Sequence, residues 1–179
     1  MTPQNILQFW FEEIDSKCWF SKNEEFDQSL HARFGKLYHQ TIQCELYQWR
    51  ATAEGRLAEI IILDQFSRNM FRDKPASFAQ DSLALALAQE AVAKGEDQKL
   101  PPERRCFMYM PYMHSESALI HKEAVRLFSQ KGLEFNMDYE LQHKSIIDRF
   151  GRYPHRNKIL GRESTREEVD FLKTEGSGF

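Results

Sequence analysis

LAEIIILDQF, residues 57–66, is the stretch of sequence that decides the fold. Drawn as a helix, it is apolar on nearly every side, which is typical of a helix buried in the middle of a protein. A helix with no solvent-facing side needs other elements to cover it. The sequence on either side of this stretch shows that those elements are helices.

Apolar residues recur at helical spacing before and after residues 57–66. The helices expected from this spacing lie near residues 3–11, 26–37, 78–93, 102–111, 120–128, 139–150 and 164–172. Pro111 is expected to end or kink its helix, and Ser164 to Glu167 fit a capping box. No segment alternates as a strand does. The sequence therefore predicts one all-α domain over residues 1–179, with roughly eight helices in antiparallel pairs.

Composition and charge narrow the classes of function. The net charge of −3 and the pI of about 6.1 disfavour a nucleic-acid partner bound through a basic face. The three cysteines form no CxxC pair, so neither a disulfide framework nor a cysteine zinc site is indicated. The N-terminus lacks the basic start of a signal peptide, and no apolar run reaches about 18 residues. We therefore expect a cytoplasmic protein without a membrane partner.

The segment HKSIIDRFGRYPHRNKILGREST, residues 143–165, concentrates cations in an acidic protein. Phe150-Gly151-Arg152 and Leu160-Gly161-Arg162 repeat one pattern, in which a glycine past a helix supplies a left-handed cap. Pro154 can begin a short helix whose free N–H groups lie beside His155 and Arg156, which is the make-up of an anion site. The alternative is that the cations cap carbonyl groups and pair with Asp148.

A second group of charges follows the buried stretch. Asp64 and Arg68 stand four residues apart, with the acid first, and fall on the aliphatic side of the helix. They are expected to form a partly buried ion pair that holds two helices in register. The functional alternative is that Arg68, with Arg72 one turn later, points a guanidinium into a cleft.

A third group lies in PYMHSES, residues 111–117, where a proline interrupts a helix. His114 can act as a general base with Glu116 as its partner, or it can be a hydrogen-bonded structural histidine. No HExxH spacing is present, so no metal is expected. The templates for phosphate-binding and nucleotide-binding loops are also absent, and no cofactor is expected.

Together, LDQFSRNMFRD, PYMHSES and residues 143–165 resemble a bacterial family, the domain of unknown function 924 family. The resemblance covers nearly the whole chain, from QFWF near the start to the capping box. It implies an all-helical fold similar to tetratricopeptide-repeat proteins. It implies no assigned reaction and no established catalytic residues.

Three functions remain open at this stage. The favoured one is a binding protein whose polar motifs converge on a concave cleft, where they hold an anionic small molecule or a peptide carboxylate. The second is a small hydrolase or transferase with His114 as base, Glu116 as orienting partner and arginines as stabilisers. The third is a scaffold for a protein partner, with a purely structural Arg/His cluster. The residues expected in the cleft are Arg68, Arg72, His114, Glu116, Arg149, Arg152, His155 and Arg156.

Overall fold

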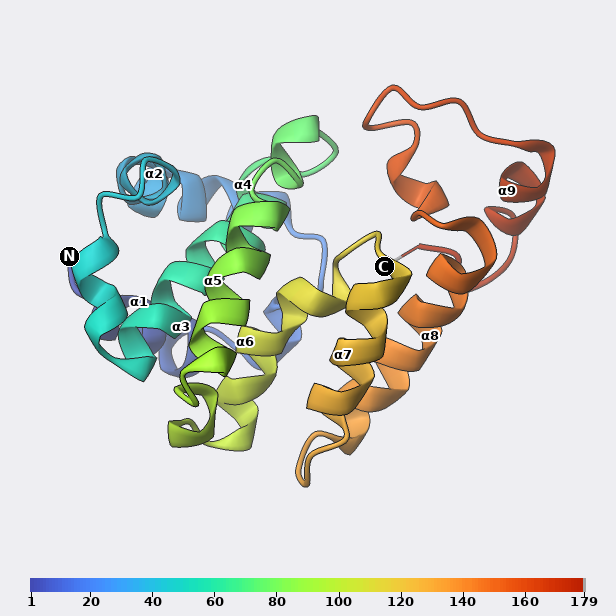
Figure 1. Cartoon of the computed structure of the whole chain (residues 1–179). Helices are drawn as coiled ribbons and strands as arrows, with labels where there is room; N and C mark the ends of the chain where they lie inside the picture. Colours follow the sequence, from blue (N-terminus) through green and yellow to red (C-terminus); the bar gives the residue numbers. More distant parts are fainter. Residues whose placement is uncertain (179) are drawn as a thin grey trace.

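The computed structural model describes residues 1–178, and all regular structure in that range is helical, which confirms the all-α prediction. The α-helices are α1 (Pro3–Gln8), α2 (Glu24–Ile42), α3 (Ala53–Ile61), α4 (Ser67–Met70), α5 (Asp81–Ala93), α6 (Pro102–Met113), α7 (Ala118–Phe128), α8 (Glu134–Phe150) and α9 (Arg166–Phe171). Short 3₁₀ turns lie in several of the connections, and Figure 1 shows the order of the helices.

The stretch at residues 57–66 forms the centre of one long rod. A π-helical turn, Ile62–Phe66, joins α3 directly to α4, so helical structure runs without a break from Ala53 to Met70. Leu57, Ala58 and every residue from Ile60 to Asp64 are fully buried. α3 packs against α1, α5 and α6, which cover it as a helix without a polar side requires. With this rod counted once, the described residues hold eight helices, as predicted.

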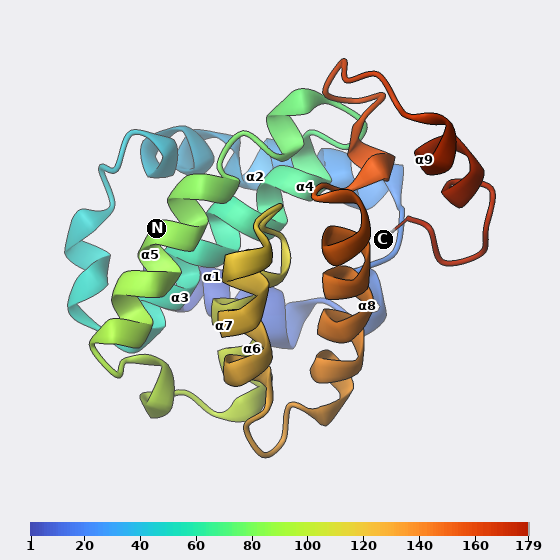
Figure 2. The ribbon, with the colours of Figure 1, turned by 45° about the vertical axis from the view of Figure 1, so that its right-hand side comes forward.

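α5, α6, α7 and α8 lie side by side in chain order, and each runs opposite to the one before (Figures 1 and 2). Gly95 and Gly132 follow two of these helices in the left-handed conformation, at φ +69° and +88°, and allow the chain to turn back. This arrangement brings the start of α5, the end of α6, the start of α7 and the end of α8 to one end of the row.

The main core is aromatic and aliphatic. Trp10, Phe34, Phe66 and Phe107 are all buried and pack around the central rod. A smaller cluster consists of Ile146, Ile147 and Tyr153, with Phe150 and Phe171 packed against it. This second cluster holds the segment after α8 against the helix row.

The C-terminal segment follows the predicted glycine pattern. Gly151 ends α8 at φ +68°, and Gly161 adopts φ +65°, so both expected left-handed turns are present. The capping box of α9 is formed by Thr165 and Glu168, one residue later than predicted. Pro111 lies inside α6, which continues to Met113. No helix in residues 1–178 is both long and apolar enough to cross a bilayer. Single-domain organisation and likeness to tetratricopeptide repeats stay predictions.

Candidate functional site

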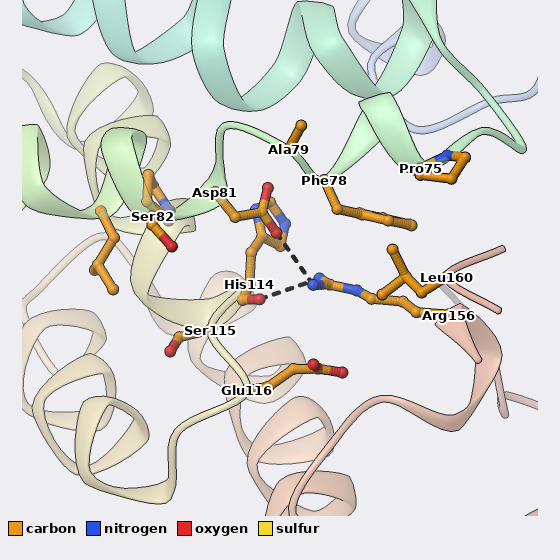
Figure 3. Close-up of a pocket in the computed structure, with 12 residues that line it drawn as sticks. Pro75, Phe78, Ala79, Asp81, Ser82, His114, Ser115, Glu116, Arg156 and Leu160 are labelled. Carbon is orange, nitrogen blue, oxygen red and sulfur yellow. Dashed lines mark hydrogen bonds and ion pairs between the residues drawn. The ribbon is translucent and has the colours of Figure 1, made fainter. Parts of the chain in front are cut away.

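A cavity of about 300 Å³ lies at the end of the helix row where α5 begins and α6 ends. Three segments form its wall: residues 75–85, residues 111–116, and the C-terminal segment with Arg156 and Leu160. Figure 3 shows the side chains that face one another across it. The antiparallel order of α5 and α6 brings the first two segments together, and the turn at Gly151 brings the third.

Asp64 does not line the cavity, but its carboxylate contacts the ring of His114, which does. The Asp64 carboxylate is fully buried in the π-helical turn, and its Oδ1 lies 2.7 Å from Nδ1 of His114. The same oxygen is 3.1 Å from Nη1 of Arg68, while Oδ2 accepts a hydrogen bond from the Gln65 amide at 2.5 Å. The ion pair between Asp64 and Arg68 that the sequence predicts is therefore present. π-helical turns are frequent at functional sites because they re-aim side chains within a helix.

The charges of this group follow from burial and neighbours. Burial alone raises the pKa of the Asp64 carboxyl, but Arg68 and His114 outweigh it and hold that pKa well below its usual range. Burial lowers the pKa of His114, and the nearby Arg68 lowers it further. At pH 7 the imidazole is therefore neutral, and Nδ1–H donates to the carboxylate. The other ring nitrogen, Nε2, is left as an acceptor.

Arg156 is the cation of the cavity wall. Its side chain is only 7% exposed, and its guanidinium lies 4.5 Å from the ring centroid of Phe78 and 4.7 Å from that of Tyr153. Nη1 donates to Oδ2 of Asp81 at 3.1 Å, and Nη2 donates to the carbonyl of His114 at 3.1 Å (Figure 3). Nε has no acceptor within residues 1–178. Burial and the nearby Arg68 lower the pKa of Arg156.

Asp81 is shared between two guanidinium groups. Arg68 donates to both of its oxygens, at 2.9 and 3.1 Å, and Arg156 donates to one of them. Asp81 thus links the central rod, α5 and the C-terminal segment. Asp64 balances Arg68 and Asp81 balances Arg156, so the two guanidinium groups and the two carboxylates of this network neutralise one another.

The Glu116 carboxylate contacts the C-terminal segment and not the side chain of His114. Its carboxylate accepts two hydrogen bonds from Arg162, at 2.6 and 2.9 Å, and one from the backbone N–H of Tyr153 at 2.7 Å. Burial raises the pKa of Glu116, but the bonds from Arg162 and Tyr153 outweigh burial and lower it. The expectation that Glu116 orients His114 is therefore wrong, because the chain turns after His114 and directs this carboxylate toward Arg162. The carboxylate that contacts the His114 ring is that of Asp64.

The structure separates the eight expected cleft residues. His114, Glu116 and Arg156 line the cavity, and Arg68 lies behind it on Asp81. The other four do not line the cavity, so the single cleft expected from the sequence is not formed.

The four residues that do not line the cavity have partners elsewhere. Arg72 pairs with Asp27 of α2 at 2.6 Å. Exposed Arg149 pairs with Glu167, and Arg152 pairs with Glu168. The ring of His155 lies 5.5 Å from that of Tyr153.

Sequence reasoning missed Asp81 and the contact between Asp64 and His114. An acid in the first turn of a helix is ordinarily explained by the helix dipole, so Asp81 gave no signal of its own. The two partners Asp64 and His114 stand 50 residues apart, and no spacing rule connects them. The nearest usable signal is that both lie beside interruptions of a helix.

The chain is similar to proteins of known sequence and structure. A solved structure of a protein of unknown function from Agrobacterium tumefaciens matches it with a TM-score of 0.90 and 37% identity, over 96% of each chain. An N-acetylglucosaminyltransferase from Rhizobium sp. (strain N33) is 32% identical over 92 residues, which are 51% of this chain and 18% of that protein. The chain thus spans only a small part of that curated relative. The family model described as "Bacterial protein of unknown function (DUF924)" matches residues 6–176, and the chain belongs to this family.

Proposed function

We propose that the cavity binds a small molecule through an anionic group, such as a carboxylate or a phosphate, and that Arg156 holds that group. The supporting observation is the state of Arg156. It is almost fully buried, it shares Asp81 with Arg68, and its Nε–H meets no acceptor in the part of the chain that the structure describes. A buried donor without an acceptor costs about 1–3 kcal/mol, more when it is charged. Nε is closed to water in the structure, so a ligand oxygen removes that cost only when the side chains around this edge move apart.

The surroundings of Arg156 suit such a role. The rings of Phe78 and Tyr153 lie within cation–π distance of the guanidinium, and their attraction helps to hold it in place. An anion bound in a dry, pre-set site loses less to solvent screening than one bound at an exposed arginine. The volume of about 300 Å³ lies at the small end of known ligand pockets, which favours a small molecule or the terminal carboxylate of a peptide.

Thermal unfolding with added sodium phosphate and sodium acetate tests the proposal. At about a hundred times its dissociation constant, a bound anion adds roughly 2.7 kcal/mol to the free energy of unfolding. We expect this gain in the wild type and not in Arg156→Gln. Arg149→Gln is the matched control, because it removes a guanidinium from the same segment at an exposed position outside the cavity. Equal stabilisation of the wild type and Arg156→Gln would remove Arg156 as an anion site.

A second candidate function is hydrolysis or group transfer, and the contact between Asp64 and His114 favours it. A buried carboxylate that fixes one ring nitrogen leaves the other as a base, which is the arrangement by which histidine activates a hydroxyl or a water. His114 would take a proton from the attacking group and return it to the leaving group. Its ring keeps 15% exposure at the cavity wall, so a substrate in the cavity can meet it.

Turnover of p-nitrophenyl acetate and p-nitrophenyl phosphate separates this function from binding. If the protein is an enzyme of this kind, His114→Gln should abolish turnover, while the stabilisation by phosphate should remain. Asp64→Asn, which no longer fixes the tautomer, should then lower kcat. Turnover that is equal in wild type and His114→Gln would exclude His114 as the base.

A further inference from the structure

The charges that line the cavity are of both signs. Arg156 is the guanidinium of the lining, and Asp81 and Glu116 are two carboxylates of the same wall. Arg68 and Arg162, which pair with these carboxylates, do not line the cavity. A ligand that carried only negative charge would meet Glu116 and Asp81 as well as Arg156, and like charges brought together in a partly dry site repel strongly.

The two carboxylates of the cavity wall also keep free acceptor positions. A carboxylate can accept about four hydrogen bonds. Asp81 receives three, from Arg68 and Arg156, and Glu116 receives three, from Arg162 and Tyr153. Each therefore keeps one further acceptor position. A ligand that fills this cavity has to bring hydrogen-bond donors of its own.

His114 adds a third acceptor to the wall. Asp64 takes the hydrogen on Nδ1, so the neutral ring presents Nε2 as a lone pair. Nε2 makes no hydrogen bond to any residue from 1 to 178, and the ring belongs to a cavity-lining residue. The buried carboxylate of Asp64 thus fixes His114 as an acceptor, which matches an ammonium group and not an anion.

Apart from Ser82 and Ser115, the remaining wall is apolar. Phe78 and Leu160 lie on one side of Arg156 in Figure 3, and Pro75, Leu85 and Pro111 also contribute. In the same view the Arg156 side chain runs between Phe78 and Glu116, so the guanidinium and a carboxylate face one small space. A ligand that carries both charges fits a wall that presents a guanidinium and carboxylates together.

From this juxtaposition we infer that the ligand is a zwitterion of the α-amino acid type with an apolar side chain. Its carboxylate meets the guanidinium of Arg156, its ammonium meets Glu116 and Nε2 of His114, and its side chain meets the apolar wall. This inference rests on the proposed function, because it assigns the same Arg156 site a ligand class. The small volume selects a free amino acid over a longer peptide.

Isothermal titration calorimetry with the wild-type protein tests the inference. The probes are L-leucine, N-acetyl-L-leucine, which lacks the ammonium, and L-leucinamide, which lacks the carboxylate. L-methionine and L-phenylalanine extend the series of side chains. We expect at least one of the three free amino acids to bind. We expect removal of either charge from L-leucine to weaken binding at least tenfold.

The two proposals fail differently. If N-acetyl-L-leucine binds as tightly as L-leucine, or if phosphate stabilises the protein while no amino acid binds, the zwitterion is wrong and the anion site stands. If L-leucinamide binds as tightly as L-leucine, or if neither an amino acid nor phosphate binds, the anion site fails as well.

Glu116→Gln tests the ammonium position directly. It keeps the size of the side chain and removes its charge, so we expect L-leucine to bind at least tenfold more weakly and N-acetyl-L-leucine to be unaffected. Glu163→Gln is the control, because it removes an exposed carboxylate from the C-terminal segment outside the cavity.

A second measurement applies if Glu116→Gln does not fold. In the ¹⁵N-labelled wild type, the Nε2 resonance of His114 should shift on addition of L-leucine and not on addition of N-acetyl-L-leucine. An unchanged Nε2 resonance at saturating L-leucine overturns the assignment of His114.

Discussion

At the scale of single residues, the interior of this protein is organised by carboxylates that serve several partners. The Asp64 carboxylate is bound by the side chains of His114, Arg68 and Gln65, and the Asp81 carboxylate is bound by two arginines. A buried charge is tolerated only when its partners replace the water that it has lost. Removal of one such carboxylate therefore leaves several buried groups without a counterpart at the same time.

Asp64→Ala is expected to lower the free energy of unfolding by about 3–5 kcal/mol, since it removes the acceptor of His114 and leaves Arg68 and Arg156 with one carboxylate, Asp81, between them. Glu167→Ala, which breaks the exposed pair with Arg149, is expected to cost about 1 kcal/mol or less. Urea denaturation of both variants measures the difference. If the two variants have the same urea midpoint, the contacts of Asp64 stabilise the fold no more than the exposed pair does.

The sequence could predict part of this residue network. The pair between Asp64 and Arg68 follows from their spacing on one helix face, which is a local property. The partners of Arg149 and Arg152 were not predictable, because Glu167 and Glu168 reach them only after the chain turns at Gly151 and Gly161. His114 and Arg156 were chosen correctly as members of one cavity, but their partners Asp64 and Asp81 depend on tertiary packing.

At the scale of elements, the apolar stretch from Leu57 to Phe66 predicted a buried helix but not its π-helical turn. Apolar residues on every side of a helix carry no periodicity, so the pattern contains no signal for a change of register. That turn sets the direction of Asp64. The positions and number of helices were therefore predictable, whereas the geometry that builds the cavity was not.

Two helical glycines give a paired prediction about element packing. An added Cβ at Gly55, in the first turn of α3, would lie 1.9 Å from the carbonyl oxygen of Trp49. Gly55→Ala should therefore destabilise the protein by about 1–3 kcal/mol through overpacking.

At Gly35 in α2, the nearest atom to an added Cβ is 3.6 Å away, which is ordinary contact. Gly35→Ala should stabilise by about 0.5–1 kcal/mol, because alanine loses less backbone freedom on folding. A higher melting temperature for Gly55→Ala would contradict the close packing at Gly55, and a lower one for Gly35→Ala would contradict the space at Gly35.

At the scale of the whole molecule, buried histidines tie the C-terminal segment to the helix row. The rings of His121, His143 and His155 lie 6.3, 5.7 and 5.5 Å from the ring of Tyr153, and they come from α7, α8 and the C-terminal segment. Burial lowers the pKa of His143 to about 3 and that of His155 to about 4, and it also lowers the pKa of His114. His114, His143 and His155 are thus neutral at pH 7 in the folded protein.

The sign of the resulting pH dependence follows from linkage. An unfolded histidine has a pKa of about 6.5, so below that pH the unfolded chain binds protons that the folded chain excludes. The stability that these histidines support is complete above about pH 6.5 and falls as the pH drops toward the lowered pKa values. Glu140, whose pKa burial raises, acts in the opposite direction. The lowered pKa values of Asp64 and Glu116 matter only at more acidic pH, below the usual carboxyl range.

Urea denaturation at pH 7 and pH 5.5 therefore gives the last prediction. Each histidine with a lowered pKa should reduce the free energy of unfolding by about 1 kcal/mol between the two values. His143→Asn is expected to remove one such contribution, so that its loss of stability on acidification is about 1 kcal/mol smaller than that of the wild type. The difference between the two pH values is the readout, because it cancels the cost of the substitution itself. His39→Asn, at an exposed position of α2, is the control and should lose as much as the wild type. An equal loss in wild type and His143→Asn would mean that His143 takes up its proton as readily in the folded protein as in the unfolded chain.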